Sequence, residues 1–208
     1  MTYEKIGRWL LAFAFIACAS NLWAANSALD EAAQVLEQES GLKLRAYSTR
    51  DFGREEYSGA RSVVVEEARA VPLLKSVRAH LPKGYVAFIG TQRSLAEPPV
   101  NGAEVVVGPG QSQFDILRIA ASDAINYGKE AEDLIKVLQE WDHQIGIDIY
   151  AAQTDTIQLK LTSRPKDLKA FADAVYKFCP DIVDQGTGSV DDLAKEIDAA
   201  QEVYLWWD

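Results

Sequence analysis

Two motifs close the chain: Cys179-Pro180-Asp181-Ile182-Val183-Asp184-Gln185-Gly186 and, after a short helical pattern, Tyr204-Leu205-Trp206-Trp207-Asp208. The second motif continues a run from Val203 that predicts a strand, in which neighbouring side chains point to opposite faces. We therefore expect Trp206 and Trp207 to face opposite sides. One ring can fill the core while the other lines a cleft or interface, although both can also be structural.

The carboxylates in these motifs form the richest polar cluster of the sequence. Asp181 and Asp184 are three residues apart in a segment that Pro180 and Gly186 prevent from forming a long helix. Such carboxylates can converge on a hard cation or act as an acid/base pair. Alternatively, they bond to nearby backbone amides, as aspartates do in turns. The candidate ligand-binding residues are Asp181, Asp184, Gln185, Trp206, Trp207 and Asp208.

Other kinds of site have weaker support. The spacing of a calcium-binding loop is absent, and no paired-cysteine or His-Glu-x-x-His pattern indicates zinc. We therefore predict no metal and no cofactor. Cys179 with His143 is the one pairing worth naming for nucleophilic catalysis, but a neighbouring carboxylate disfavours the thiolate of Cys179. Since Phe178 and Pro180 flank it, burial at a helix end is the favoured interpretation, and Cys179 is a lower-ranked candidate.

The two closing motifs resemble an uncharacterised bacterial family called domain of unknown function 4253. The likeness extends in pattern from Arg61 to Asp208 and is strongest at Phe178–Gly186 and Leu205–Asp208. Members of the family share the C-P-D-I-V-D-Q-G run and the terminal W-W-D. Further positions that look like family positions are Asn126, Tyr127 and Asp155. The resemblance implies an α+β fold and a bacterial setting, but no reaction, ligand or catalytic residue.

The N-terminus has the features of an export signal. Lys5 and Arg8 precede an apolar run, Trp9 to Ala17, which is too short to span a bilayer as a helix. Cleavage after residues 22–24 would release a soluble periplasmic protein. Alternatively, the residues before Cys18 resemble a lipobox, and cleavage there would leave a lipid-anchored protein of the cell envelope. An uncleaved anchor is the third alternative. The resemblance associates many family members with chains that lack such a segment. The predicted export signal therefore sets this chain apart from them.

The charge of the chain limits its partners. Thirty-one acidic residues against 21 basic residues give a net charge of −10. A surface this acidic repels phosphate backbones, so nucleic acid is excluded as a predicted partner. The acidic surface favours a protein partner with a basic surface. Alternatively, the charge only keeps the protein soluble. Membrane contact is predicted only through a lipid anchor at Cys18.

The first half of the chain predicts alternating elements. A helix is expected from Ser27 to Ser40, capped by Ser27 and ended by Gly41, with Leu29, Ala32, Ala33 and Leu36 inward. The polar stretch Leu44 to Gly59 predicts a connector outside the core. A β-α-β unit then follows, with a strand at 62–65, a helix opened by Pro72, and a strand at 85–89. Residues 91–102 predict a surface loop.

The second half predicts two hairpins and three helices. Glu104–Val107 and Phe114–Ile119 would pair across Gly108-Pro109-Gly110. Helices are expected at Glu130–Ile145, from Pro165 to Phe178, and after Ser189 as cap. The alternation over residues 147–151 and 157–161 predicts an antiparallel hairpin with one wet face.

These patterns predict a single α+β domain with a mixed, largely antiparallel sheet flanked by helices. The predicted divisions are a signal peptide at 1–24, an N-terminal helix and polar connector at 25–60, and the α+β domain at 61–208. The function that we expect is a non-catalytic binding domain of the cell envelope, for example an immunity-type protein that neutralises a basic toxin. The alternative is a hydrolase or metal-dependent enzyme that uses Asp181, Asp184 and Asp208.

Overall fold

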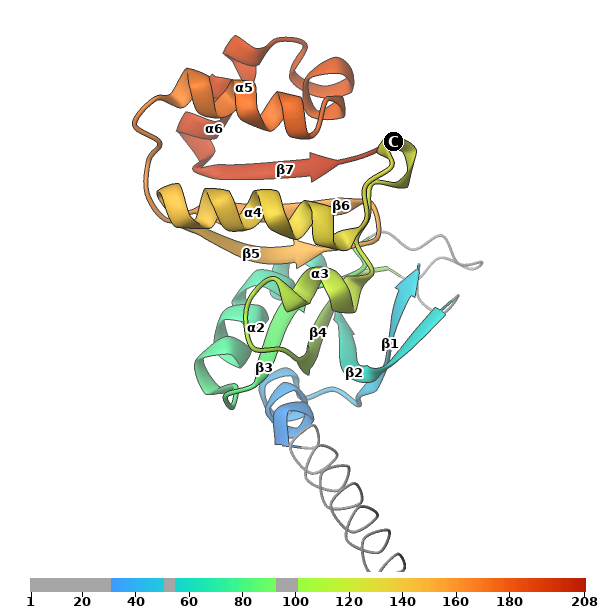
Figure 1. Cartoon of the computed structure of the whole chain (residues 1–208). Helices are drawn as coiled ribbons and strands as arrows, with labels where there is room; N and C mark the ends of the chain where they lie inside the picture. The colour runs from blue at the N-terminus through green and yellow to red at the C-terminus, as the bar shows by residue number, and fades with distance from the viewer. Residues whose placement is uncertain (1–30, 51–54, 93–100) are drawn as a thin grey trace, which may run out of the picture.

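The described part of the chain forms one seven-stranded sheet with the order β1-β2-β4-β3-β5-β6-β7 (Figure 1). The computed structural model describes residues 31–50, 55–92 and 101–208. Residues 31–40 are helical. They are followed by β1 (Arg45–Arg50), β2 (Glu55–Val65), α2 (Glu67–His80), β3 (Tyr85–Ile89), β4 (Ala103–Pro109), α3 (Asp115–Ala120), the 3₁₀ turn η1 (Ile125–Tyr127), α4 (Ala131–Ile145), β5 (Ile147–Ala152), β6 (Thr156–Leu161), α5 (Leu168–Phe178), the π-helical segment η2 (Ile182–Thr187), α6 (Val190–Ala200) and β7 (Glu202–Trp206).

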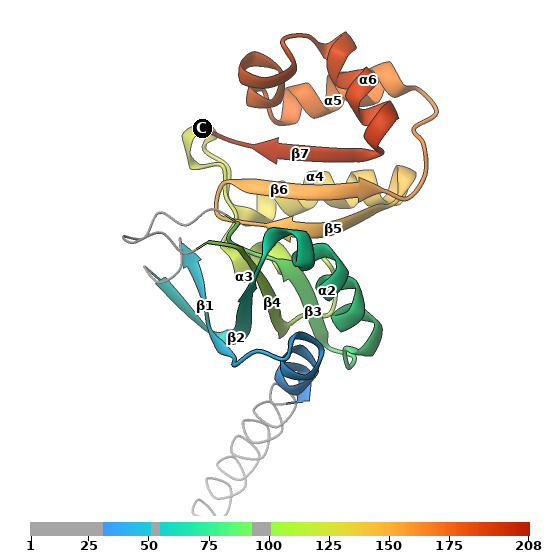
Figure 2. The ribbon, with the colours of Figure 1, turned by 180° about the vertical axis from the view of Figure 1, so that it is seen from behind.

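The α+β fold predicted from the sequence is confirmed. The pair β3–β5 is parallel, and the other five neighbouring pairs are antiparallel. Helices α3 and α4 cover one face of the sheet, while α2 and the helical residues 31–40 cover the other (Figures 1 and 2). None of the helices in the described part of the chain is both long enough and apolar enough to cross a membrane.

Several predicted elements are confirmed with small changes. Gly41 has a φ of +68°, which a glycine adopts without strain, where the first helix ends. Ala32, Ala33 and Leu36 of that helix are buried, while the predicted cap Ser27 and Leu29 lie outside the described residues. Helix α5 begins at Leu168 instead of Pro165, because the side chain of Asp167 accepts the N–H of Ala170 and caps it there.

The predicted hairpin between residues 104–107 and 114–119 is wrong. Asp115 begins α3, and its carboxylate accepts the backbone N–H groups of Gln111 and Ser112 at 2.8 and 3.0 Å. The buried residues of this segment follow helical spacing, which the apparent alternation concealed. Strand β4 pairs instead with β2 and β3. The buried residues of α3 are Ile116, Leu117, Ile119 and Ala120.

The predicted connector at residues 44–59 is also wrong. It forms β1 and the first half of β2, which pair as an antiparallel hairpin at the edge of the sheet. Tyr47 on β1 is fully buried and packs edge-on against Phe88. Polar composition concealed these strands, because an edge strand needs few apolar side chains.

The predicted β-α-β unit is present as β2, α2 and β3, but its helix begins earlier than predicted. Strand β4 lies between β2 and β3, so the two strands that α2 connects are not neighbours. Helix α2 begins at Glu67, which places Pro72 inside the helix and not at its start. The preceding residues extend the helix backwards because Ala70 joins Leu73 and Leu74 on its buried side. The predicted loop after β3 lies mostly outside the described residues.

The buried carboxyl of Glu104 gives the fold a testable pH dependence. Burial raises its pKa from an ordinary value of 4.5 to about 7, against the opposing effects of the Ser62 hydrogen bond and the charge of Arg45. The folded state therefore keeps this proton while the unfolded chain loses it, so the contribution of Glu104 to stability is largest below pH 4.5 and is lost as the pH rises towards 7.

We expect Glu104→Gln to remove this fall. Relative to the wild type, the free energy of unfolding of the variant should increase by about 3 kcal/mol between the two ends of this pH range. Urea unfolding at several pH values measures it. The same substitution at the exposed Glu140 is the control. A difference between Glu104→Gln and the wild type that does not change with pH would contradict the assignment.

Candidate functional site

The end of the chain is held by one buried carboxylate. Asp181 is 5% exposed and accepts hydrogen bonds from three groups. Its Oδ1 accepts the hydroxyl of Tyr127 at 2.7 Å and the side-chain amide of Gln185 at 3.1 Å. Its Oδ2 accepts the backbone N–H of Asp208 at 2.9 Å. We call the residues Tyr127, Cys179, Asp181, Gln185 and Asp208 the C-terminal lock.

These hydrogen bonds set the ionisation of the lock. Burial alone would raise the pKa of Asp181, but the bonds from Asp208, Tyr127 and Gln185 outweigh it and hold that pKa below 3.8. The hydrogen bond to Asp181 also raises the pKa of the Tyr127 hydroxyl to about 12. Asp181 is therefore a charged acceptor whose oxygens already have donors. A general acid needs a proton to give, and a metal ligand needs an oxygen that has no donor. The Asp181 carboxylate has neither.

Cys179 belongs to the same lock. It is fully buried, and its Sγ donates to the backbone oxygen of Trp206 at 2.9 Å. Burial raises the pKa of this thiol to about 11. Since the thiolate is the nucleophilic form, the favoured interpretation of Cys179 as a buried structural residue fits this geometry.

The two tryptophans face opposite sides, as the strand pattern predicts. Trp207 is 4% exposed and packs edge-on against Phe178, with ring centroids 5.4 Å apart. Phe178 in turn packs against Trp141, and its backbone oxygen accepts the ammonium of Lys129 at 2.9 Å. Trp207 thus extends the aromatic core, while Trp206 is half-buried on the other side of β7.

The remaining candidates from the sequence do not converge on one point. Asp184 is exposed and accepts the hydroxyl of Tyr176 at 3.1 Å. Asp155 contributes its backbone oxygen to the N–H of Trp207 at 3.1 Å, while its own carboxylate has a pKa raised by burial and by the charges of Asp123 and Asp208. Asn126 is an exposed residue of η1.

Convergence of these carboxylates on a hard cation, which was one alternative from the sequence, has no geometric support. Among the residues that the structure describes, no three His, Cys, Asp or Glu side chains are grouped so that they could hold a metal ion.

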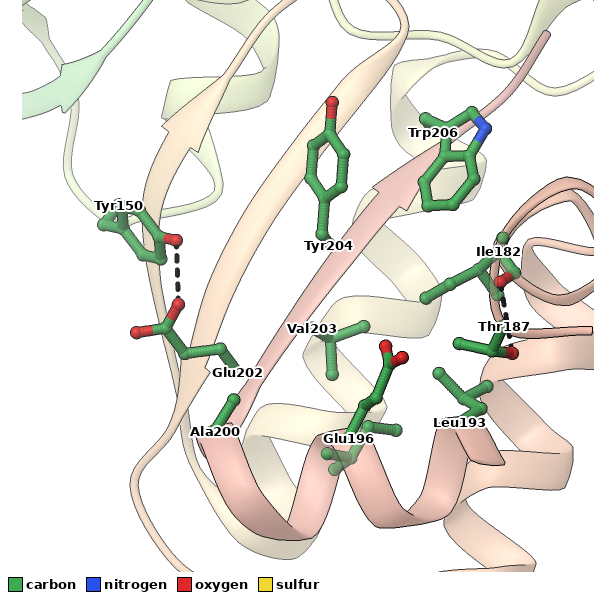
Figure 3. Close-up of a pocket in the computed structure, with 12 residues that line it drawn as sticks. Tyr150, Ile182, Thr187, Leu193, Glu196, Ala200, Glu202, Val203, Tyr204 and Trp206 are labelled. Carbon is green, nitrogen blue, oxygen red and sulfur yellow. Dashed lines mark hydrogen bonds between the residues drawn. The ribbon is translucent and has the colours of Figure 1, made fainter. Parts of the chain in front are cut away.

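A groove of about 420 Å³ lies beside the lock, between β7 and α6 (Figure 3). We call it the β7 groove. Its apolar walls come from both elements and from η2, and its polar groups are a threonine, two tyrosines and two glutamates. The residues that line it are Tyr150, Ile182, Gly186, Thr187, Leu193, Glu196, Ile197, Ala200, Glu202, Val203, Tyr204 and Trp206.

Gly186 connects the groove to the lock. A Cβ at this position would lie 2.7 Å from Cη2 of Trp206, closer than atoms can pack. The glycine therefore allows the indole of Trp206 to lie directly against η2. Trp206 is also tilted by 33° against Tyr204, with ring centroids 5.3 Å apart. These contacts fix an aromatic pair at one end of the β7 groove.

The two glutamates of the groove differ in their pairing. Glu202 accepts the hydroxyl of Tyr150 at 3.1 Å and pairs with Lys160 at 3.1 Å. Glu196 extends from α6 into the space between β7 and the side chains of Thr187 and Leu193 (Figure 3). It forms no ion pair with a described residue. Glu196 is therefore the carboxylate that the groove offers to a cation.

Trp206 was a candidate from its sequence motif, whereas Tyr204, Glu202 and Glu196 beside it in the groove were not. The signal for the first two was present, because they alternate with buried residues on the same strand as Trp206. No sequence pattern placed Glu196 opposite them, since that depends on how α6 packs beside β7.

The comparison with protein families agrees with these motifs. The family model described as Domain of unknown function (DUF4253) matches residues 104–208. The chain belongs to the DUF4253 family. No curated protein and no solved structure matches the chain in the corresponding comparisons. The DUF4253 match includes all residues of the lock and of the β7 groove. It begins at Glu104, later than the Arg61 suggested by the resemblance.

The lock predicts a large difference between two aspartates of one motif. In Asp181→Asn the amide cannot accept at both ends, so the donor of one part-buried hydrogen bond loses its partner, at a cost of about 2 kcal/mol. Asp184→Asn on the exposed side should change stability by less than about 0.5 kcal/mol. Chemical unfolding at pH 7 measures both.

The pH dependence separates charge from shape. Because the pKa of Asp181 is lowered on folding, its contribution is present above 3.8 and is lost as the pH falls through the lower folded value. The difference between wild type and Asp181→Asn should therefore shrink in acid. Equal effects of the two asparagine substitutions would contradict the lock.

A double-mutant cycle tests the contact between Gly186 and Trp206. Gly186→Ala should cost about 1–3 kcal/mol because the indole must move. In a Trp206→Leu background the same change should cost less than about 0.5 kcal/mol, since the clashing atoms are gone. If the alanine costs the same in both backgrounds, the glycine serves another purpose.

Proposed function

We propose that this DUF4253 protein is a non-catalytic binding domain of the bacterial cell envelope, which holds a partner protein with a basic surface in the β7 groove. One observation carries the proposal: Glu196 projects into a groove with apolar and aromatic walls, and it forms no ion pair with a described residue. A cationic side chain of a partner would complete it. Tyrosine and tryptophan beside such a carboxylate supply large contact area at interfaces.

The enzyme alternative has less support at the same residues. The carboxylate of Asp181 is occupied by three donors, and Asp184 bonds to Tyr176 on another side. Cys179 is buried with a raised pKa. A hydrolase would need at least one of these groups to face a substrate, whereas each has a structural partner.

The envelope part of the proposal rests on the N-terminal sequence, which lies outside the described residues. The segment from Trp9 to Ala17 favours export, with cleavage after residue 24 or lipidation at Cys18. An immunity-type role fits the same features, because a net charge of −10 steers a basic toxin towards the domain.

Site-specific photo-crosslinking in the native host tests the proposal. A benzophenone amino acid replaces Tyr204 in the groove or, as control, the exposed Val71 on α2. We expect a crosslinked adduct with a basic protein at position 204 and none at position 71. Glu196→Lys should reduce the yield at least about fivefold, because it reverses the charge that attracts the partner.

The proposal fails if position 204 gives no adduct. It also fails if position 71 gives the same adduct, or if Glu196→Lys leaves the yield unchanged. Cleavage or turnover of the crosslinked protein would favour the enzyme alternative instead.

A further inference from the structure

Strand β7 is the last strand of the sheet, so one of its edges has no neighbouring strand among the described residues. Two hydrogen bonds show which residues face β6: the N–H of Leu161 donates to the oxygen of Gln201 at 2.8 Å, and the N–H of Trp207 donates to the oxygen of Asp155 at 3.1 Å. Because antiparallel bonding alternates, Val203 and Leu205 also bond to β6. The backbone groups of Glu202, Tyr204 and Trp206 therefore point outward.

The lock covers one end of this outer edge. Cys179 donates to the outward oxygen of Trp206, and Asp181 accepts the N–H of Asp208, at 2.9 Å each. The middle of the edge is different, since the outward N–H and C=O of Tyr204 bond to no other described residue. An unpaired edge of this kind is a template for another strand.

The β7 groove runs beside this open stretch. Figure 3 shows Tyr204 and Trp206 along β7, with Leu193 and Thr187 on the opposite side. Helix α6 forms the far wall, and Glu196 extends from it towards the strand. An extended chain placed here would meet backbone groups on one side and α6 on the other.

Charge decides between two occupants. A second copy of this chain would bring a further net charge of −10 and a second Glu196 to the same edge. Like charges placed together oppose such pairing. A basic segment has the opposite preference, because Glu196 attracts a lysine or arginine at this position.

We infer that the open edge of β7 binds an extended basic segment of the partner as an additional strand, through main-chain hydrogen bonds to Tyr204 and a charge pair with Glu196. The inference rests on the proposed function and specifies how the groove would be used. Main-chain bonds supply affinity in this mode, and alternate side chains supply selectivity. One set of partner side chains would lie on the face of the sheet that carries Tyr204 and Trp206, and the other set would lie on the opposite face.

The test uses a defined probe on the full-length protein: a fluorescein-labelled hexapeptide of alternating lysine and valine, measured by fluorescence anisotropy. Two further peptides have N-methyl groups on either all lysine amides or all valine amides. In an added strand, alternate amides face the neighbouring strand and the rest face away. We expect one methylated peptide to bind at least about tenfold more weakly, which is about 1.4 kcal/mol, and the other to change less than about threefold.

A pair of protein variants tests the same bonds from the other side. Tyr204→Pro removes the outward N–H, and the bonds to β6 remain because Tyr204 lies opposite Gln158 in a pair that does not exchange them. Tyr204→Ala removes the ring but keeps the N–H. We expect proline to weaken binding at least about fivefold relative to alanine. If proline prevents folding, the methylated peptides decide.

Three outcomes would overturn the inference. Equal binding of the two methylated peptides would mean that charge alone attracts the segment, and the proposed function would stand. A dimer in sedimentation that Tyr204→Pro dissociates would identify a second copy as the occupant. No measurable binding of any hexapeptide would exclude main-chain recognition, while crosslinking at position 204 would still judge the proposed function separately.

Discussion

The carboxylate of Asp181 joins three parts of the chain that are far apart in sequence. It accepts a hydroxyl from the turn before α4, an amide from η2 and the backbone N–H of the final residue. A buried charge is stable only when donors surround it, so each of these segments must keep its place for the others to keep theirs. The end of β7 is held by this requirement, because Asp208, two residues after the strand, is one of the three donors.

The two closing motifs are best understood as one interlocking unit. Cys179 bonds to the backbone of Trp206, Asp181 bonds to Asp208, and Gly186 leaves space for the indole of Trp206. The residues of the first motif therefore serve the placement of the second. This explains why Asp181, which belongs to a carboxylate cluster that resembles a catalytic one in the sequence, has a structural role in the fold. It also explains how the groove beside Trp206 obtains a rigid aromatic wall.

The sequence predicted most of the fold after residue 120 and less before it. The amphipathic α4, the hairpin of β5 and β6 and the cap at Ser189 each depend on local signals, and each is present. The segment at Phe114–Ile119 was wrongly predicted as a strand, because its residues alternate over a short run and also satisfy helical spacing. Only packing against the sheet decides between the two. The hairpin of β1 and β2 was not predicted for a related reason. It lies at the edge of the sheet, where strands can form with few apolar side chains.

The candidate site was also predicted only in part, because some of its residues have a local sequence signal and others do not. Sequence reasoning found Asp181, Cys179 and Trp206 because they are unusual residues in a dense motif, but it could not tell a satisfied carboxylate from a vacant one. It missed Glu196 because nothing local marks a helix residue that faces a strand edge.

An open strand edge is a hazard for any sheet protein, and β7 shows how this one limits it. The strand has only five residues, its far end is bonded by the lock, and α6 lies alongside. What remains accessible is the short stretch around Tyr204, flanked by a carboxylate that disfavours an identical acidic chain. The features that protect the edge from indiscriminate pairing are thus the same ones that would restrict it to a short basic segment. The same short edge and the same carboxylate thus account both for protection against pairing with identical chains and for selectivity towards a basic segment.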